Sequence, residues 1–189
     1  MALTYSKMTA LGSMAPDFHL PAANPSLDGP DNEMRELSDF AGGKALVVAF
    51  ICNHCPFVVH MEDALLGVAR AYQTRGVHFV GISANDARMY PADSFENMAR
   101  RAHEKSYPFS YLYDETQEAA VAYGAACTPD IFVYDEALIL VYRGRFDETR
   151  PGLGAAHGGD LAQALDELLD SGTVTMDQVP SMGCNIKWK

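Results

Sequence analysis

The stretch Ala45-Leu-Val-Val-Ala-Phe-Ile-Cys-Asn-His-Cys-Pro56 decides the fold of this chain. Residues 45–51 are continuously apolar and rich in branched side chains, a pattern typical of a strand that is covered on both faces. Beyond Pro56, apolar side chains recur at helical spacing, at Phe57, Met61, Leu65, Val68 and Tyr72. The sequence therefore predicts a buried strand, a pair of cysteines and an amphipathic helix that ends near Gly76.

Strands and helices alternate along the rest of the chain. Further strands are predicted at Phe18–Leu20, Arg35–Leu37, Val77–Ser83, Phe109–Tyr113, Ile131–Tyr134 and Leu138–Arg143. Further helices are predicted around Phe95–Ala102, at Thr116–Tyr123 and from Asp160 to Ser171. Asp93 with Glu96 three residues later resembles a capping box, so the first of these helices is expected to be capped by Asp93.

This order of elements predicts an α/β chain with a thioredoxin-like fold. It implies a mixed central sheet with helices on both faces and an N-terminal β extension. The two N-terminal strands are expected to be joined by the turn-forming residues of Pro21–Asn32. Residues 1–189 are expected to form a single domain, with a core at about 12–171 and an aperiodic C-terminal tail at 172–189.

Composition narrows the range of partners. The chain has 189 residues and a formal net charge of -11, the wrong sign for phosphate backbones and anionic lipid headgroups, so we expect no nucleic acid and no membrane partner. The longest apolar runs fall short of the roughly 20 residues that cross a bilayer. No basic patch leads into an apolar segment at the N-terminus, so we expect no secretory signal and a reducing, cytoplasmic compartment.

The motif C-x-x-C, formed by Cys52 and Cys55, lies where the buried strand ends and the helix begins. The unpaired N–H groups and the positive dipole of a helix N-terminus stabilise a thiolate there. The two-residue spacer places both sulfurs within bonding reach, so one can attack a substrate disulfide and the other can resolve the mixed disulfide. Cys52, nearer the exposed strand end, is predicted to be the nucleophile. The pair predicts thiol–disulfide exchange, for which we expect no cofactor.

Two other interpretations of the pair are a chance core pairing and a zinc site. Zinc needs two further ligands, and the remaining cysteines, Cys127 and Cys184, are single and distant in the sequence, so no metal site is predicted. His54, between the paired cysteines, either lowers a thiol pKa by its positive charge or is an exposed histidine without effect on the redox potential.

Three segments carry a resemblance to a known family: Ala15-Pro-Asp-Phe18, Phe50-Ile-Cys-Asn-His-Cys-Pro56 and Ala126-Cys-Thr-Pro-Asp-Ile-Phe-Val-Tyr-Asp135. Together they resemble the thioredoxin-fold redoxins of the alkyl hydroperoxide reductase/thiol-specific antioxidant type. The resemblance implies that Pro129 is cis and lies against the cysteine pair. It also implies that the backbone of Thr128 pairs with an extended substrate.

The chain departs from this family's common pattern at several positions. Ile51 stands where a tryptophan often precedes the first cysteine, and Leu46 stands where thioredoxins carry a buried, proton-accepting acid. Cys127, beside Pro129, either forms an alternative disulfide with the C-x-x-C pair or is a small buried residue. Cys184 in the tail is either a resolving thiol or an exposed one, and both readings stay open.

The same family suggests a thiol peroxidase as a rival enzyme. In this reading Cys55 is oxidised to a sulfenic acid and another cysteine resolves it. An arginine near the pocket is then expected, and Arg143 and Arg145 are the candidates, the alternative for both being a solvated hairpin end.

A rival from another class is a copper or zinc delivery protein that adds a distant histidine, such as His157, to the cysteine pair. Such copper chaperones carry C-x-x-x-C and a membrane tether, and the sequence has neither. The partners expected for the main reading are protein or small-molecule disulfides, peroxides for the rival enzyme, and a thiol electron donor. The exposed edge of such a sheet also suggests a homodimer.

Overall fold

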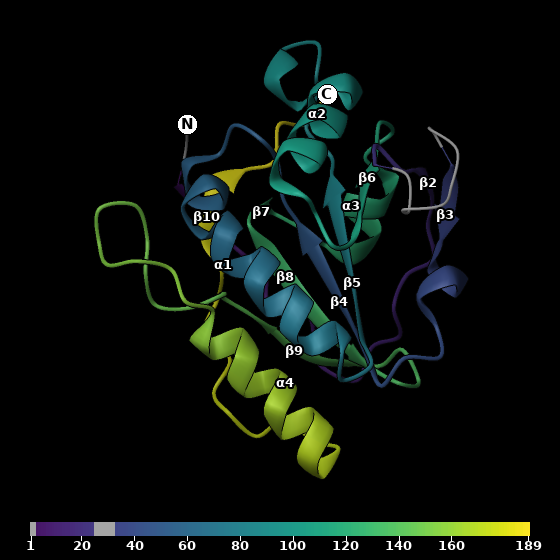
Figure 1. Ribbon diagram of the computed structural model, residues 1–189, viewed down its shortest axis with the longest axis vertical. Helices are drawn as coiled ribbons and strands as arrows, with labels where there is room; N and C mark the ends of the chain where they lie inside the picture. Colours follow the sequence, from purple (N-terminus) through teal and green to yellow (C-terminus); the bar gives the residue numbers. More distant parts are fainter. Residues whose placement is uncertain (1–2, 25–32) are drawn as a thin grey trace.

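A five-stranded mixed sheet forms the centre of the computed structural model, which describes residues 3–24 and 33–189 (Figure 1). Its strands are β4 (Ala45–Phe50), β5 (Val77–Ser83), β6 (Ser110–Tyr113), β8 (Asp130–Asp135) and β9 (Leu140–Gly144), in the order β6-β5-β4-β8-β9. Strands β4, β5 and β6 run parallel, whereas β4 with β8 and β8 with β9 are antiparallel. The predicted mixed sheet, with its closing hairpin, is confirmed.

Helices cover both faces of this sheet, as predicted. The helices are α1 (Pro56–Gln73), α2 (Phe95–Lys105), α3 (Glu118–Tyr123) and α4 (Gly159–Ser171), with short 3-10 turns η1 (Leu37–Phe40) and η2 (Pro91–Asp93). Side chains of α1, α2 and α4 share one hydrophobic cluster with one face of β4. Side chains of α3 share a second cluster with the other face. The sheet is therefore the middle of three layers.

Strand β4 supplies both clusters because successive side chains of a strand point to opposite faces. Val47 and Ala49 lie in the cluster with α1, whereas Leu46, Val48 and Phe50 lie in the cluster with α3. All of these side chains are buried, and full burial of each of the larger ones contributes about 1.5–3 kcal/mol. This two-sided burial explains the continuous apolar run and holds the end of β4, where the cysteines follow, in a fixed place.

The predicted N-terminal β extension is present as an antiparallel pair. Strands β2 (His19–Pro21) and β3 (Met34–Glu36) pair with each other and, with η1, cover the α3 face of the sheet. Of the turn-forming segment predicted between them, residues 25–32 lie outside the described residues. The extension also reaches one edge of the central sheet, where the Ala23 N–H donates to the Tyr111 carbonyl at 2.8 Å.

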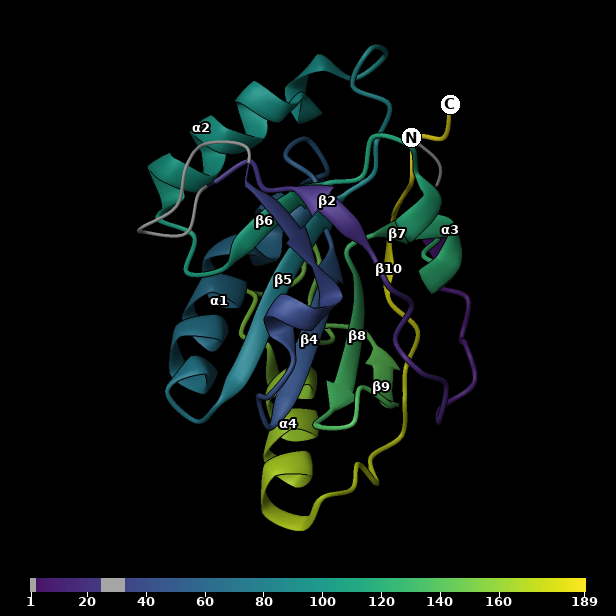
Figure 2. The ribbon, with the colours of Figure 1, turned by 90° about the vertical axis from the view of Figure 1, so that its right-hand side faces the viewer.

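The C-terminal tail, whose sequence shows no periodic pattern, contains strand β10 (Met182–Asn185). β10 lies between β1 (Leu3–Tyr5) and β7 (Cys127–Thr128) and pairs antiparallel with both. Figure 2 shows β10 beside β7. Its four residues show no alternation of apolar and polar side chains. The strand is defined instead by main-chain pairing with two strands that are remote in the sequence. Cys184 and Ile186 are buried in the two hydrophobic clusters, and we therefore propose that the tail belongs to the same domain as the sheet.

The expected cap of α2 is also corrected. Ser94, not Asp93, is the N-cap, and its Oγ accepts the N–H of Asn97 at 3.3 Å. Asp93 ends the η2 turn just before the helix, with its side chain buried. The Asp93 carboxylate is thereby left available for other partners.

Candidate active site

The C-x-x-C pair occupies the turn from β4 into α1. Cys55 is the N-cap residue of α1, and its carbonyl accepts the first helical N–H, from Val59, at 2.9 Å. Pro56 is the first helical residue, where its missing N–H removes no helical hydrogen bond. The sequence therefore predicted the backbone frame of the motif correctly.

Both sulfurs are buried, which corrects the expectation that Cys52 lies at an exposed strand end. Cys52 is 1% exposed and Cys55 is 0% exposed. Cys55, rather than Cys52, is the residue at the helix N-terminus. The prediction of Cys52 as the nucleophile rested on an exposed strand end, and the structure does not supply that premise.

Thr128 and Pro129 lie against the cysteine pair, as the family resemblance implied, and their peptide bond is cis. The Sγ atom of Cys52 is 3.4 Å from Thr128 Oγ1. The protonated Cys55 thiol donates to the Thr128 carbonyl at 3.0 Å. Residues from two segments far apart in the sequence thus meet at one point.

The backbone of Thr128 is not open to a substrate strand in this structure. Thr128 is the register partner of Cys184 in the antiparallel pairing of β7 with β10, so the chain's own tail lies where the predicted substrate would. This pairing also places Cys184 Sγ 2.9 Å from Cys55 Sγ. The alternative of an exposed Cys184 is wrong, because this residue is buried.

The surroundings divide the thiols into one acidic and two weakly acidic groups. Hydrogen bonds from Cys52, and secondarily from Cys184, lower the pKa of Cys55 to about 5 against the effect of burial. Burial raises the pKa of Cys52 well above its ordinary value, and the hydrogen bond to Cys55 and the charge of Asp93 add to the rise. Burial also raises the pKa of Cys184 to about 12. The surroundings therefore favour Cys55 as the most acidic of these three thiols.

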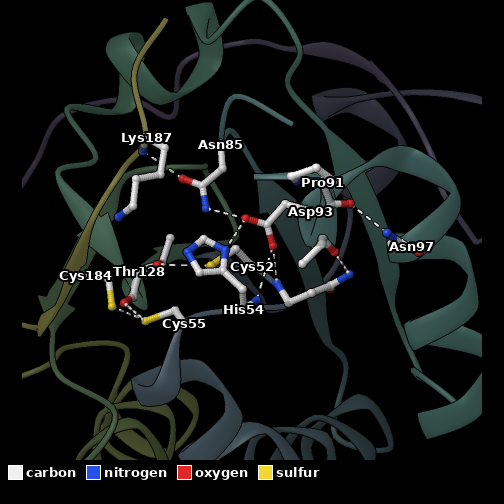
Figure 3. A network of polar contacts seen from close by, with 12 residues as sticks. Cys52, His54, Cys55, Asn85, Pro91, Asp93, Asn97, Thr128, Cys184 and Lys187 are labelled. Carbon is white, nitrogen blue, oxygen red and sulfur yellow. Dashed lines mark hydrogen bonds and ion pairs between the residues drawn. The ribbon is translucent and has the colours of Figure 1, made fainter. Parts of the chain in front are cut away.

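A network centred on Asp93 holds the residues between the two cysteines (Figure 3). One carboxylate oxygen of Asp93 accepts the backbone N–H groups of Asn53 and His54, at 2.8 and 3.2 Å. The other accepts from the Asn85 amide at 2.8 Å and lies 2.5 Å from His54 Nδ1. Sequence reasoning missed this network, since it assigned Asp93 to a helix cap.

His54 is held on two sides, so the alternative of an exposed histidine is wrong. Its ring stacks on Tyr90 with centroids 5.1 Å apart, and its side chain is 17% exposed. Its Nε2 atom is buried and has no hydrogen-bond partner among residues 3–24 and 33–189. His54, Asp93 and Cys52 also bring one ligand atom each within 4.8 Å of one another, a set that could contribute to a metal site.

The match to a family model decides the family. Residues 11–143 match the model of the AhpC/TSA family. The chain belongs to the AhpC/TSA family. Its members are thioredoxin-like redoxins, so the resemblance stated from the sequence is confirmed.

Solved structures support the same fold for this AhpC/TSA chain. An uncharacterized conserved protein from Geobacillus kaustophilus is 48% identical over 100% of this chain and 97% of its own, with a TM-score of 0.93. A hypothetical protein from Sinorhizobium meliloti 1021 is 44% identical over 98% of both chains, with a TM-score of 0.92. The thioredoxin domain of a thiol-disulfide oxidoreductase from Bacteroides vulgatus is 20% identical over 86% of this chain and 99% of its own, with a TM-score of 0.63, which shows the thioredoxin-like fold. No curated protein matches the chain.

The remaining candidates of this AhpC/TSA chain have carboxylate partners of their own. Arg143 is fully buried, not solvated, and bonds Asp130 at 3.2 Å, whereas Arg145 bonds Asp160 at 2.6 Å. His157 groups with Asp147 and Glu148 in a separate acidic cluster. The two arginines are thus already paired, and His157 does not complete a metal site with the cysteine pair.

The Cys127 thiol forms its hydrogen bond with a backbone carbonyl rather than with a sulfur of the Cys52–Cys55 pair. Its thiol donates to the Pro129 carbonyl at 3.4 Å, and burial raises its pKa. This contact matches the small buried residue more closely than the alternative disulfide partner.

Across residues 3–24 and 33–189, no helix combines the length and apolarity that a membrane span requires.

The charge of Asp93 gives a prediction about Cys52. Asp93→Asn keeps the side-chain shape but removes a negative charge that disfavours a second one on the nearby sulfur. We expect the pKa of Cys52 to fall while staying above that of an ordinary thiol, because burial persists. Ultraviolet thiolate absorbance against pH, recorded in a Cys55→Ser background, measures it. Asp63→Asn, an exposed change on α1, is the control, and an unshifted titration in Asp93→Asn would contradict the assigned charge effect.

Proposed function

We propose that this AhpC/TSA chain is a thiol–disulfide oxidoreductase that exchanges electrons through a Cys52–Cys55 dithiol and disulfide. One observation carries the proposal: both sulfurs of a C-x-x-C motif at a helix start contact Thr128, the residue before Pro129. The lowered pKa of Cys55 supports it, since thiolates rather than thiols attack disulfides.

The site residues supply each step of the exchange. The Cys55 thiolate attacks one sulfur of a substrate disulfide, whose S–S bond breaks and releases a substrate thiolate. Cys52 gives its proton to that leaving group, and its sulfur attacks the Cys55 sulfur of the mixed disulfide. The second substrate thiolate leaves, and the Cys52–Cys55 disulfide remains. An external thiol donor then returns a pair of electrons to the protein.

The pH dependence of the exchange tests this proposal. With a Cys55 pKa of about 5, the thiolate fraction, and hence the rate, should rise through pH 5 and level off before neutral pH. Release of thiol from a small aromatic disulfide, followed by stopped flow in a single turnover, measures the profile. A midpoint near the ordinary thiol pKa of about 8.5 would mean that Cys55 is not the activated group.

A peroxidase is the second candidate, favoured by the same low pKa of Cys55. Peroxide would convert the Cys55 thiolate to a sulfenic acid, which a neighbouring thiol could condense with. Both candidate arginines are paired with carboxylates, Asp130 and Asp160, which favours disulfide exchange. Trapping of a Cys55 sulfenic acid at rates above those of disulfide exchange would move the assignment to the peroxidase.

Substrate class, compartment and assembly complete the proposal. We propose small-molecule disulfides as the first substrates, because β10 already occupies the Thr128 edge, with protein disulfides requiring its displacement. A cytoplasmic location remains our proposal, resting on the expected reducing compartment. The homodimer stays a prediction for light scattering to test, and the edge strand β9 is partly covered, since the Leu140 N–H donates to the Ser13 carbonyl at 2.8 Å.

A further inference from the structure

The sulfur of Cys184 lies as close to the catalytic pair as a thiol can without bonding. Cys184 Sγ and Cys55 Sγ are 2.9 Å apart, and a disulfide needs about 2.05 Å, so a movement below about 1 Å joins them. Both residues are buried and belong to regular elements, β10 and the start of α1. The proximity therefore belongs to the folded core.

Gly183 makes this approach of β10 sterically feasible. A Cβ atom at this position would lie 2.1 Å from the Thr128 carbonyl oxygen and 2.7 Å from its carbon. Real Cβ atoms do not approach backbone this closely, so any other residue would push β10 away from β7. The strand pairing that holds Cys184 on Cys55 thus depends on a glycine.

We propose that Cys184 is a third redox-active cysteine. Its sulfur attacks the Cys52–Cys55 disulfide at Cys55, and a Cys55–Cys184 disulfide replaces it. The proposal rests on the function proposed above and extends it. The sulfur of Cys184 attacks the Cys55 sulfur, the Cys52–Cys55 bond breaks, and the Cys184 proton passes to the released Cys52 sulfur. One disulfide is present before and after the step, so no oxidant is consumed.

The two disulfides differ in what they do to the tail. A Cys52–Cys55 bond lies within one turn of chain and leaves β10 held by its strand pairing and packing, without a covalent bond. A Cys55–Cys184 bond ties β10 covalently to α1 and keeps it on the Thr128 edge. The position of the disulfide therefore decides whether this edge can open to an extended substrate.

Disulfide mapping of the full chain tests the proposal. The wild type and three variants, Cys52→Ser, Cys184→Ser and Cys127→Ser, are oxidised with glutathione disulfide, alkylated and mapped by mass spectrometry without reduction. In Cys52→Ser, Cys55 should attack glutathione disulfide, and Cys184 should then displace glutathione to give the Cys55–Cys184 disulfide. Cys184→Ser should form only Cys52–Cys55. Cys127→Ser, which removes a buried thiol that donates to the Pro129 carbonyl, should match the wild type.

The outcomes separate this inference from the proposed function. If Cys52→Ser keeps glutathione on Cys55 while retaining a native circular dichroism spectrum, Cys184 is not redox-active. A wild-type Cys52–Cys55 disulfide in the same experiment would leave the proposed function standing. If Cys52→Ser forms the Cys55–Cys184 disulfide but Cys184→Ser forms no Cys52–Cys55 disulfide, the proposed function is overturned instead.

A glycine substitution gives a second, independent readout. Gly183→Ala in the Cys52→Ser background should displace β10 and lose most of the Cys55–Cys184 disulfide, with glutathione retained on Cys55. Gly67→Ala is the matched control, because a Cβ at this α1 position meets nothing within 4 Å. Equal Cys55–Cys184 yields in both variants would show that the strand pairing does not position Cys184.

Discussion

Replacement of Cys55 by serine is expected to lower the rate of thiol–disulfide exchange by at least about 10³-fold, the scale of loss when an enzyme nucleophile is removed. Cys55 is the sulfur with the lowered pKa, and it contacts both Thr128 and Cys184. A serine hydroxyl at this position does not ionise near neutral pH and forms no disulfide. Stopped-flow release of thiol from a small disulfide measures the loss.

The matched variant Cys52→Ser distinguishes the role of the Cys52 sulfur from that of the Cys55 sulfur. It keeps the Cys55 thiolate, so the first thiol should still be released in a single turnover at a rate within about 10-fold of the wild type. The opposite pattern, with release kept in Cys55→Ser and lost in Cys52→Ser, would restore Cys52 as the nucleophile. The two variants together therefore test the order of attack that the structure favours.

Asp130→Ala is expected to lower the free energy of unfolding by about 3–5 kcal/mol, the usual loss when one partner of a buried ion pair is removed. Asp130 and Arg143 are both fully buried, and their side chains bond at 3.2 Å. The Arg143 guanidinium also stacks on Phe132, 4.4 Å from the ring centroid, so it cannot turn toward water without disrupting the core. Its charge would remain buried without a counter-ion.

Urea unfolding at neutral pH measures this loss. Asp166→Ala is the control, because Asp166 pairs with Arg75 at the surface, where an exposed ion pair contributes about 0–1 kcal/mol. A change below about 1 kcal/mol in Asp130→Ala would show that Arg143 is accommodated by other partners, such as the Gly124 carbonyl at 3.0 Å.

The parts of the fold that the sequence predicted are those with a local periodic signal. The apolar run at 45–51 and the helical stripe after Pro56 reproduce β4 and α1, because burial alone dictates both patterns. The same pairing of strand and helix identified Cys52 and Cys55 as the candidate pair. The cis Thr128–Pro129 bond was implied by the family resemblance rather than by any local pattern.

The missed parts depend on contacts between distant segments. Met182–Asn185 shows no strand periodicity, and Cys184 is 129 residues from Cys55 in the sequence. Asp93 resembles a helix cap in sequence, yet its carboxylate binds Asn53 and Asn85, and Ser94 serves as the cap instead. The prediction of an exposed Cys52 is wrong because no sequence pattern shows that tertiary packing buries the strand end.

The central claim is that Cys52 and Cys55 form a reversible disulfide, and mass mapping in glutathione redox buffers tests it most directly. A Cys184→Ser chain is equilibrated over a range of reduced to oxidised glutathione, then acid-quenched, alkylated and mapped. We predict a Cys52–Cys55 disulfide whose fraction rises as the buffer becomes more oxidising and falls when it is returned to reducing conditions. Both thiols staying unreactive, with a metal ion bound in equal molar amount, would contradict the account and make the pair a ligand site.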